Sequence, residues 1–247
     1  MERRAPVYTL ERVDSTNTRL KELARQGAPD GTLLIAREQT SGRGRLGRSF
    51  ASPPGGLYLS MLLRPPRAAE RCASLTPLAA LAVRRAAAAC AGVTPAIKWP
   101  NDLLLHGKKL CGILTELSGS AQAPQLIVGV GVNVNTAPED FPEELRESAC
   151  SLFGETGRRV ALDALAQRLA AELDALYAAW LRDERSFLEE YRAACVTVGQ
   201  EILVLQNGAG RPARALGIRE DFSLEVEYAD GSREALRFGE VSVRPGV

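Results

Sequence analysis

The chain contains 247 residues, of which 45% are hydrophobic and 25% are charged, a composition that excludes wholesale disorder. Its 31 basic and 30 acidic residues give a formal net charge of +1, which argues against a polyelectrolyte partner holding the whole surface. No stretch reaches the ~18 uncharged apolar residues of a membrane-spanning helix, and the N-terminal segment has no apolar core for export. We therefore expect a cytoplasmic protein that does not use a membrane.

The first third of the chain alternates predicted strands and helices. Apolar patterns predict strands at 7–13, 32–37 and 57–63 and helices from about 15 to 27 and over 72–91. Ser15 or Thr16 can cap the first helix, and Gly27 is a natural stop for it. Between the second and third strands lies a segment with no apolar period, which predicts a loop at 41–50.

The rest of the chain changes character near residue 197. Before it, strands are predicted at 96–99, 103–106, 109–117 and 125–134, a long flexible loop at 135–160, and helices at 162–181 and 187–191, with turns at His106-Gly107 and 118–124. After it come only short alternating segments, with turns at Asn207-Gly208 and Asp230-Gly231. This pattern predicts an α+β domain over 1–196 and a small β-barrel over 197–247.

Cysteine and histidine usage predicts no metal site. The five cysteines include no CxxC pair, and the single His106 has no companion at ligand spacing, so we expect buried, reduced thiols and no bound metal. One histidine in a hairpin turn also makes a Ser/His/Asp triad implausible, and no cysteine has a base partner. The chemistry is therefore expected to rest on charge stabilisation and positioning, as in phosphoryl or nucleotidyl transfer.

The loop SGRGRLGRSF, residues 41–50, concentrates glycine and arginine. Its glycines allow close approach of backbone N–H groups to a ligand, and its arginines can bind phosphate or carboxylate with two hydrogen bonds each. The loop lacks the Gly-Lys-Ser/Thr of a Walker A motif, and no helix pattern follows its G-x-G-x-x-G letters. By itself it is equally well a solvated basic turn.

The segment 98–117 is a second concentration of polar residues. Pro100 forces a turn, and Asn101 and Asp102 lie at that turn, where they can reach a ligand or cap backbone groups. A predicted hairpin returns Lys109 alongside them, so an inward lysine could hold a carboxylate and a phosphate together. A pair of lysines in solvent is the alternative. Gly112 within a strand indicates close approach of a ligand or a backbone.

The third concentration is VGVGVNVN, residues 128–135. Gly129 and Gly131 remove the side chains from one face of the strand, which leaves a flat wall for a planar group. A bulged core strand is the alternative. Asn133 and Asn135 can cap the following loop or bind a sugar or phosphate.

Taken together, these segments closely resemble biotin protein ligases. The matching blocks, in order, are DSTN (14–17), Gln39 with SGRGRLGR (41–48), GGLYLSMLL (55–63), KWPNDL (98–103), KKLCGILTE (108–116), VGVGVNVN (128–135) and GEVSVR (239–244). The resemblance implies an α+β fold with a central mixed β-sheet flanked by helices, the class II synthetase-like catalytic domain of biotin and lipoate ligases. It also implies an SH3-like barrel at the C-terminal end.

The activity implied by the resemblance has two steps. Biotin and ATP give biotinyl-5′-adenylate and pyrophosphate, with Mg²⁺ accompanying ATP, and biotin is then transferred to a lysine of the biotin carboxyl carrier protein or domain of acetyl-CoA carboxylase or another biotin carboxylase. A homodimer is compatible with the family. Only about 13 residues precede DSTN, which leaves no room for the helix-turn-helix domain of repressor members, so we expect no DNA binding.

The resemblance also assigns site residues. Lys109, Arg45 and Asp102 are the expected catalytic residues. The expected biotin contacts are Ser15, Thr16, Asn17, Gln39, Arg43, Gly44, Arg45, Lys109, Gly112 and Leu114. The expected ATP and adenylate contacts are Arg43, Arg45, Arg48, Phe50, Asn101, Lys109, Gly129, Gly131 and Asn133.

The chain departs from the family pattern at two loop positions. Leu46 stands where some members have a basic residue, and Phe50 where many have tryptophan, which makes a smaller aromatic wall. The adenine contacts in 135–153 stay unassigned, and this loop and 41–50 are expected to order on ligand binding. A lipoate or octanoate ligase or transferase is the nearest enzymatic alternative. A non-catalytic biotin or nucleotide sensor and an SH3-like adaptor are the others.

Overall fold

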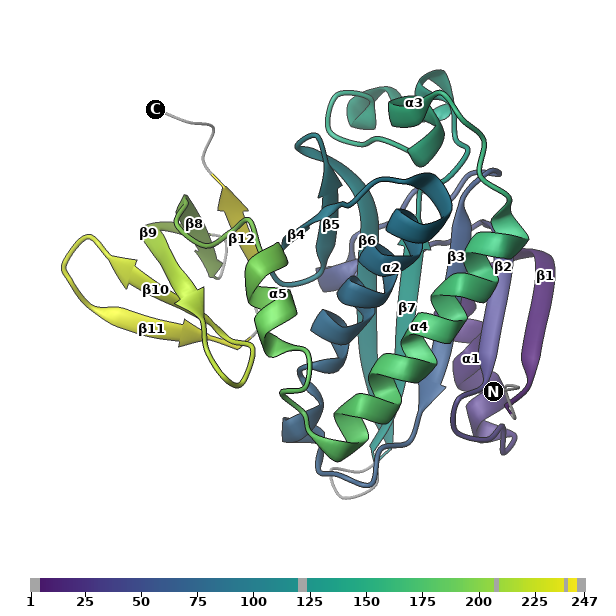
Figure 1. Cartoon of the computed structure of the whole chain (residues 1–247), viewed down its shortest axis with the longest axis horizontal. Coiled ribbons are helices and arrows are strands. Elements are labelled where there is room, and N and C mark those ends of the chain that lie inside the picture. The colour runs from purple at the N-terminus through teal and green to yellow at the C-terminus, as the bar shows by residue number, and fades with distance from the viewer. Residues whose placement is uncertain (1–4, 120–123, 207–208, 238–239, 244–247) are drawn as a thin grey trace.

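The protein is described from a computed structural model that covers residues 5–119, 124–206, 209–237 and 240–243. Figure 1 shows a large sheet with helices on both faces and a smaller sheet at one side. The large sheet has seven strands in the order β1-β2-β3-β7-β6-β5-β4, and it is mixed because β1 runs parallel to β2 while the other neighbours are antiparallel. The predicted mixed sheet flanked by helices is therefore confirmed. Its strands are β1 (Val7–Val13), β2 (Leu33–Gln39), β3 (Leu57–Leu63), β4 (Ala96–Lys98), β5 (Asp102–Leu105), β6 (Lys108–Gly119) and β7 (Pro124–Val132).

The two faces of the large sheet are covered by different helices because the strand side chains alternate. Leu62 and Ile127 pack with Leu20 against α1 (Thr16–Arg25), whereas Met61 and Val128 belong to the core under α2 (Leu75–Ala91) and α4 (Leu162–Arg182). Helix α1 thus lies on the face opposite α2 and α4 (Figure 1). This helix lies mainly over β2, β3 and β7 and reaches β6 only near Leu114 and Glu116, so it leaves the first half of β6 uncovered on that face.

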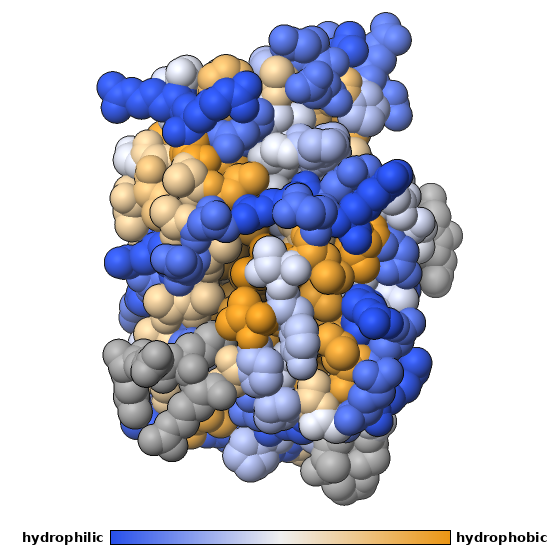
Figure 2. Space-filling model, turned by 90° about the vertical axis from the view of Figure 1, so that its right-hand side faces the viewer, coloured by the Kyte–Doolittle hydropathy of each residue, from blue (hydrophilic) through white to orange (hydrophobic). Residues whose placement is uncertain are grey.

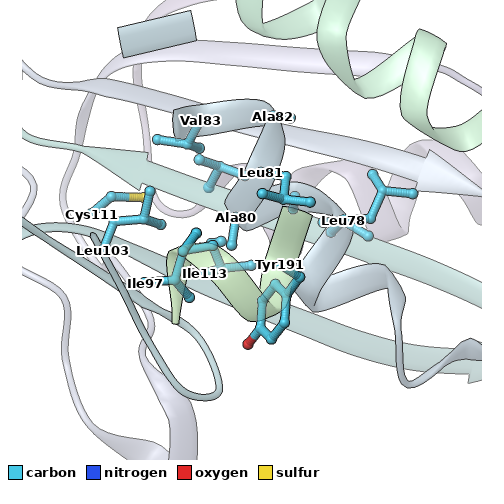
Figure 3. Close-up of a cluster of buried hydrophobic side chains, with 14 of the residues drawn as sticks. Leu78, Ala80, Leu81, Ala82, Val83, Ile97, Leu103, Cys111, Ile113 and Tyr191 are labelled. Carbon is cyan, nitrogen blue, oxygen red and sulfur yellow. The ribbon is translucent and has the colours of Figure 1, made fainter. Parts of the chain in front are cut away.

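The core beneath α2 fixes the strands that carry the polar residues on their other side. Figure 3 shows Leu78 and Ala80–Val83 of α2 packed with Ile97 of β4, Leu103 of β5, Cys111 and Ile113 of β6, and Tyr191 of α5 (Leu188–Ala194). All of these side chains are buried. Because side chains alternate along a strand, burying Cys111 and Ile113 turns Gly112 and Leu114 to the opposite face.

The predicted helices hold with two corrections. Helix α1 is capped by Ser15, as expected, and ends at Arg25, two residues before Gly27. Helix α2 begins at Leu75 rather than at 72, because residues 69–72 form a separate 3-10 turn. The helices predicted at 162–181 and 187–191 correspond to α4 and α5.

The segment 135–160, predicted as one long flexible loop, contains regular elements, so that prediction was wrong in this respect. This segment contains 3-10 turns at Pro138–Asp140 and Glu143–Leu145 and a short helix α3 (Leu152–Thr156), whose Ser151 cap accepts a hydrogen bond from the Gly154 backbone. Its backbone is also tied to β6, since Lys109 N–H donates to Ser148 O and Cys150 N–H donates to Lys109 O. Short turns without an apolar period escape pattern reading.

The C-terminal segment forms a separate five-stranded sheet in the order β11-β10-β9-β8-β12. All neighbours are antiparallel, and the last strand returns to pair with the first. A closed barrel is not confirmed among the described residues, and the predicted turn at Asn207-Gly208 lies outside them, as does most of 118–124. The strands are β8 (Glu201–Gln206), β9 (Ala209–Ile218), β10 (Leu224–Tyr228), β11 (Arg233–Leu236) and β12 (Glu240–Val243).

The β1 edge of the large sheet is a mixed surface. Figure 2 shows apolar areas on this side of the molecule crossed by bands of hydrophilic residues. Val7 and Tyr8 are exposed here, and so are the charged Glu11 and Arg12 of the same strand. Charges on an edge strand disfavour uncontrolled strand pairing. Within the described residues, no helix has the length and apolar character needed to cross a membrane.

Candidate active site

A pocket opens on the sheet face that α1 leaves uncovered. Its walls come from the start of α1, the end of β2, the 41–50 loop, the turn at Trp99–Asn101, strands β6 and β7, and Val241 of β12; its volume is about 160 Å³. All sequence-predicted site residues except Asn133 line this central pocket. They are Ser15, Thr16, Asn17, Gln39, Arg43, Gly44, Arg45, Arg48, Phe50, Asn101, Asp102, Lys109, Gly112, Leu114, Gly129 and Gly131.

One end of the central pocket is a buried network of uncharged groups. Thr16 backbone N–H and hydroxyl both approach Gln39 Oε1, at 2.8 and 3.0 Å. Gln39 Nε2 donates to Ser52 Oγ at 2.9 Å. Ser60 Oγ lies 2.7 Å from Thr16 Oγ1 and 2.6 Å from Asn17 Oδ1. Hydrogen bonds fix every one of these side chains, so this neutral end is built before any ligand arrives.

Glycines on β6 and β7 make room for two side chains at successive levels of the sheet. A Cβ added at Gly129 would lie 2.2 Å from Asn17 Oδ1, and one at Gly131 would lie 2.5 Å from the Phe50 ring. Gly112 also abuts that ring, at 2.9 Å. The flat wall predicted from the sequence exists, and Phe50 is the planar group that lies on part of it. Gly129 and Gly131 are two residues apart on β7, so the places of Asn17 and Phe50 above them are separated by roughly 6–7 Å along the strand.

The other end of the central pocket is charged. Lys109 Nζ forms an ion pair with Asp102 Oδ1 at 2.8 Å and stands 5.9 Å from the centre of the Phe50 ring. Arg45 Nη1 donates to Asn101 Oδ1 at 2.9 Å, and Asn101 Nδ2 donates to Ile113 O at 3.1 Å. With Lys98, Arg43 and Arg48, Lys109 and Arg45 bring the described cationic side chains that line the cavity to five. Asp102 is the single acidic side chain among its described lining residues.

The loop that carries the arginines is folded back on itself. Gly44 N–H donates to Arg48 O at 2.7 Å and Phe50 N–H donates to Gly42 O at 2.9 Å. A Cβ at Gly42 would lie 2.3 Å from Phe50 O, so this close approach requires glycine. At the tip, Leu46 has φ 55° and is 74% exposed, and it lines the rim of the pocket together with the arginines on either side of it. The alternative of a purely solvated turn therefore does not hold for the loop as a whole.

Asn133 is not brought into the central pocket. Its buried side chain donates to Cys150 O at 3.0 Å and lines an adjoining cavity with Phe141. Asn135 donates to Val160 O at 2.8 Å and accepts from Val160 N–H at 2.9 Å, so it fastens the following segment. The nucleotide contact expected of Asn133 stays a prediction. The adjoining cavity shares Ser49, Phe50, Lys98, Asp102 and Lys109 with the central pocket.

Several residues that build the site were missed by sequence reasoning. Ser60 is fully buried in β3 among large hydrophobic residues, and a small hydroxyl residue inside such a strand was the signal. Val241 reaches the pocket from the C-terminal sheet, which no local pattern could indicate. Trp99 is anchored to the same part of the chain, because its backbone N–H donates to Thr197 Oγ1 at 2.9 Å and its indole N–H donates to Phe222 O at 3.1 Å.

Glu116 is the other missed residue. Its carboxylate accepts hydrogen bonds from Asn17 Nδ2 at 2.8 Å and Lys21 Nζ at 2.6 Å, and Arg43 Nη1 lies 3.1 Å away. Burial raises the pKa of Glu116, but these hydrogen bonds and the charges of Lys21 and Arg43 outweigh burial, so the pKa lies below its ordinary value. Glu116 is therefore ionised at neutral pH.

The described residues contain no group of three or more His, Cys, Asp or Glu side chains that could hold a metal ion. The five cysteines are free, and four of them are buried. Burial raises the pKa of Cys150 to about 12, so this thiol is protonated at neutral pH and is not a nucleophile. A neutral end and a cationic end within one cavity define a site for an uncharged polar group joined to an anion.

The chain belongs to the Biotin/lipoate A/B protein ligase family, whose sequence profile matches residues 9–133. The chain is 43% identical over 150 residues to the bifunctional ligase/repressor BirA of Bacillus spizizenii, a match that covers 60% of this chain and 46% of that protein. It is 42% identical over 176 residues to the biotin--[acetyl-CoA-carboxylase] ligase of Paracoccus denitrificans, covering 67% of this chain and 73% of the relative. The matches to the first curated relatives thus span about half of their length.

The fold matches a solved structure over nearly its whole length. The biotin protein ligase of Aquifex aeolicus, solved in complex with biotin and ATP, is 30% identical, has a TM-score of 0.84, and is matched over 98% of this chain and 99% of that one. The comparison includes the C-terminal sheet, which the family profile does not cover.

Proposed function

We propose that the protein is an ATP-dependent biotin protein ligase that activates biotin as biotinyl-5′-adenylate and transfers it to a lysine of a biotin carboxyl carrier protein or domain. The single observation that carries this proposal is the polarity of the central pocket, with a neutral hydrogen-bonding end at Asn17 and a cationic end at Lys109. Biotin has this polarity, since its uncharged ureido ring is joined to a carboxylate. The names of the relatives and of the solved structure support the same assignment.

In the first step a carboxylate oxygen of biotin attacks the α-phosphorus of ATP, and the bond from that phosphorus to the bridging oxygen breaks to release pyrophosphate. Two anions must approach each other, so the cations of the pocket serve to offset their repulsion and the charge that develops on the leaving group. Lys109 would lie between carboxylate and α-phosphate, and Asp102 orients it through their 2.8 Å ion pair. Arg45, held by Asn101, would cover the phosphate.

In the second step the amine of the carrier lysine attacks the carbonyl carbon of the mixed anhydride. The bond from that carbon to the phosphate oxygen breaks, AMP leaves with the electron pair, and the amine loses a proton. No covalent intermediate with the enzyme is needed, which agrees with the raised pKa of the Cys150 thiol. The loop arginines would retain the adenylate until the carrier arrives.

Magnesium would enter the pocket on the phosphates of ATP. The ion prefers oxygen ligands and is commonly bound by one or two carboxylates together with substrate phosphates. Asp102 is the carboxylate that lines the described part of the pocket, and it is already paired with Lys109. The residues present fit a metal carried by the nucleotide, with at most Asp102 as a protein ligand, and the ion would neutralise phosphate charge.

The C-terminal sheet would complete the ligase. Its meander of four strands with a fifth pairing back on the first has the strand order expected of an SH3-like barrel. Val241 lining the pocket and the hydrogen bonds to Trp99 support a role in shaping the site. A homodimer, the absence of DNA binding and a cytoplasmic location stay predictions; the free cysteines suit a reducing compartment.

Pyrophosphate release tests the activation step against the sister activity. Purified protein with MgATP should release pyrophosphate when biotin is added, and not when lipoate or octanoate is added. Biotin should also raise the melting temperature, because a ligand that binds only the folded state stabilises it. Release with lipoate alone would assign the chain to lipoate ligation, and binding of biotin without any release would make it a sensor.

A further inference from the structure

Glu116 joins α1 and the 41–50 loop to β6 through one carboxylate. It lies on β6 next to the neutral end, with a side chain only 16% exposed. Its partners are Asn17 in the first turn of α1, Lys21 one helical turn further on, and Arg43 in the 41–50 loop. Nothing in the two chemical steps uses this carboxylate.

The negative charge of Glu116 beside a pocket for anions must be compensated by nearby cations. This charge would repel biotin carboxylate and phosphate if it stood alone. Two cations, Lys21 at 2.6 Å and Arg43 at 3.1 Å, offset that charge. Glu116 and its two cationic partners therefore carry a net positive charge, and the carboxylate fixes the positions of the groups bonded to it.

We propose that Glu116 is a positioning residue that sets the hydrogen-bond polarity of Asn17 and fastens the 41–50 loop over the pocket through Arg43. This inference rests on the proposed ligase function. Its two parts are carried by different contacts, one within the neutral end and one across to the loop.

The polarity of Asn17 follows from its neighbours. An ionised carboxylate only accepts hydrogen bonds, so it must face the amide nitrogen, and a flipped amide would set Oδ1 against it. The two N–H groups of Asn17 Nδ2 are used by Glu116 at 2.8 Å and Leu114 O at 3.2 Å. Oδ1 lies near Ser60 Oγ and over Gly129 of the pocket wall, so the amide presents an acceptor there. An acceptor is what an N–H group of a ureido ring requires.

The loop is fastened on two sides of the pocket. On one side Arg43 reaches Glu116 at 3.1 Å, and on the other Arg45 reaches Asn101 at 2.9 Å. The Arg43 side chain is 49% exposed, so little else is packed around it, and the ion pair supplies its anchor. Loss of Glu116 should let this side of the loop lift and release the intermediate.

The test is Glu116→Gln, with Glu22→Gln as the matched control. Glu22 belongs to α1 and forms an exposed ion pair with Arg19, so its replacement removes an equivalent charge away from the pocket. We expect Glu116→Gln to weaken biotin binding and to speed dissociation of biotinyl adenylate, each about 10- to 100-fold, as for loss of hydrogen bonds to a charged group. ATP binding measured without biotin and the Glu22→Gln variant should stay within about twofold of wild type.

A double-mutant cycle with Arg43→Gln keeps the proposal falsifiable if Glu116→Gln loses stability. The adenylate dissociation rates of the two single variants and the double variant should be clearly non-additive, since the two residues share one contact. Additive effects, or wild-type biotin affinity in a folded Glu116→Gln protein, would overturn the positioning role. Failure of the wild-type protein to release pyrophosphate with biotin would instead overturn the ligase function itself.

Discussion

The two ends of the central pocket are built in different ways. At the neutral end, Thr16 and Asn17 are each 4% exposed and Ser60 is 0% exposed, and strands and a helix hold them. At the charged end, the side chain of Lys109 is 38% exposed and is held by its ion pair with Asp102. The neutral end is therefore fixed before binding, whereas the charged end can rearrange when anions enter. Recognition of an uncharged ring needs a preformed network, and activation needs cations that can follow moving charge.

The largest expected effect separates the charged end from the neutral end. Replacing Lys109 by alanine should slow pyrophosphate release about 10²- to 10³-fold, as for loss of one group that stabilises developing charge. Because the side chain is 38% exposed, the fold should persist, and biotin binding at the neutral end should change little. Single-turnover kinetics measures the rate of pyrophosphate release, and calorimetry measures the affinity for biotin. A large loss of biotin affinity with unchanged chemistry would show that the two ends do not divide these tasks.

The converse change lies at the neutral end. The Cβ added by Gly129→Ala would lie only 2.2 Å from Asn17 Oδ1, so the Asn17 amide must move. We expect biotin affinity to fall about 10- to 100-fold because buried hydrogen bonds are broken, while ATP binding measured alone is retained. Isothermal titration with each ligand tests this. An equal loss of affinity for both ligands would indicate general disruption of the sheet. Gly210→Ala in the C-terminal sheet serves as the control, because the nearest atom to its added Cβ would be 3.4 Å away, an ordinary contact distance.

An intermediate effect is expected at the loop. Arg45→Gly removes the contact with Asn101 and should increase release of biotinyl adenylate about tenfold or more, with a smaller effect on its formation. Trapping the released adenylate from a rapid-quench reaction measures both rates. Retention of the intermediate at the wild-type level would remove the covering role from this arginine.

A smaller effect concerns stability. Ser60→Ala removes the hydroxyl that contacts Thr16 Oγ1 and Asn17 Oδ1. Because both oxygens are buried, the change should lower the free energy of unfolding by about 1–3 kcal/mol. Thermal unfolding, with replacement of the exposed Ser186 by alanine as a reference, measures it. An unchanged melting temperature would show that the neutral end is looser than its geometry indicates.

The smallest effect is a pH dependence. The pKa of Glu116 is lowered in the folded state, so the carboxylate contributes stability above its unfolded pKa of about 4.3 and loses it as the pH falls through the folded value. Glu116→Gln should therefore show a flatter decline of stability below about pH 4.5 than wild type. Denaturant titrations from neutral pH to pH 3 compare the two. Parallel curves would mean that the pKa is not lowered by folding.

The sequence predicted the parts of the site that lie in continuous motifs. Asn17, Gln39 and Lys109 stand in recognisable segments, and the alternation of β6 predicts which face Gly112 takes. The roles given to these residues stay predictions, although the structure brings all but Asn133 to one pocket. Long periodic elements such as α4 were also predictable, because apolar periodicity is a local property.

Other features depended on tertiary packing. Ser60, Glu116 and Val241 reach the site only through sheet order and the placement of the second sheet, which single segments do not encode. The start of helix α3 is fastened by backbone hydrogen bonds from Leu152 to Asn133 O and from Phe153 to Val134 O, and Val160 is held by Asn135; none of these contacts depends on an apolar period. Tertiary packing also decides the role of Asn133, which was predicted to contact a ligand but whose amide donates a hydrogen bond to Cys150 O.

The most direct test of the ligase function is the intact mass of a biotin carboxyl carrier domain after incubation with the protein, biotin and MgATP. We expect a gain of one biotin, which disappears without ATP, with Lys109→Ala, or when the acceptor lysine of the carrier is replaced. No gain in mass, with biotin bound by the wild-type protein and the carrier folded, would contradict the ligase function.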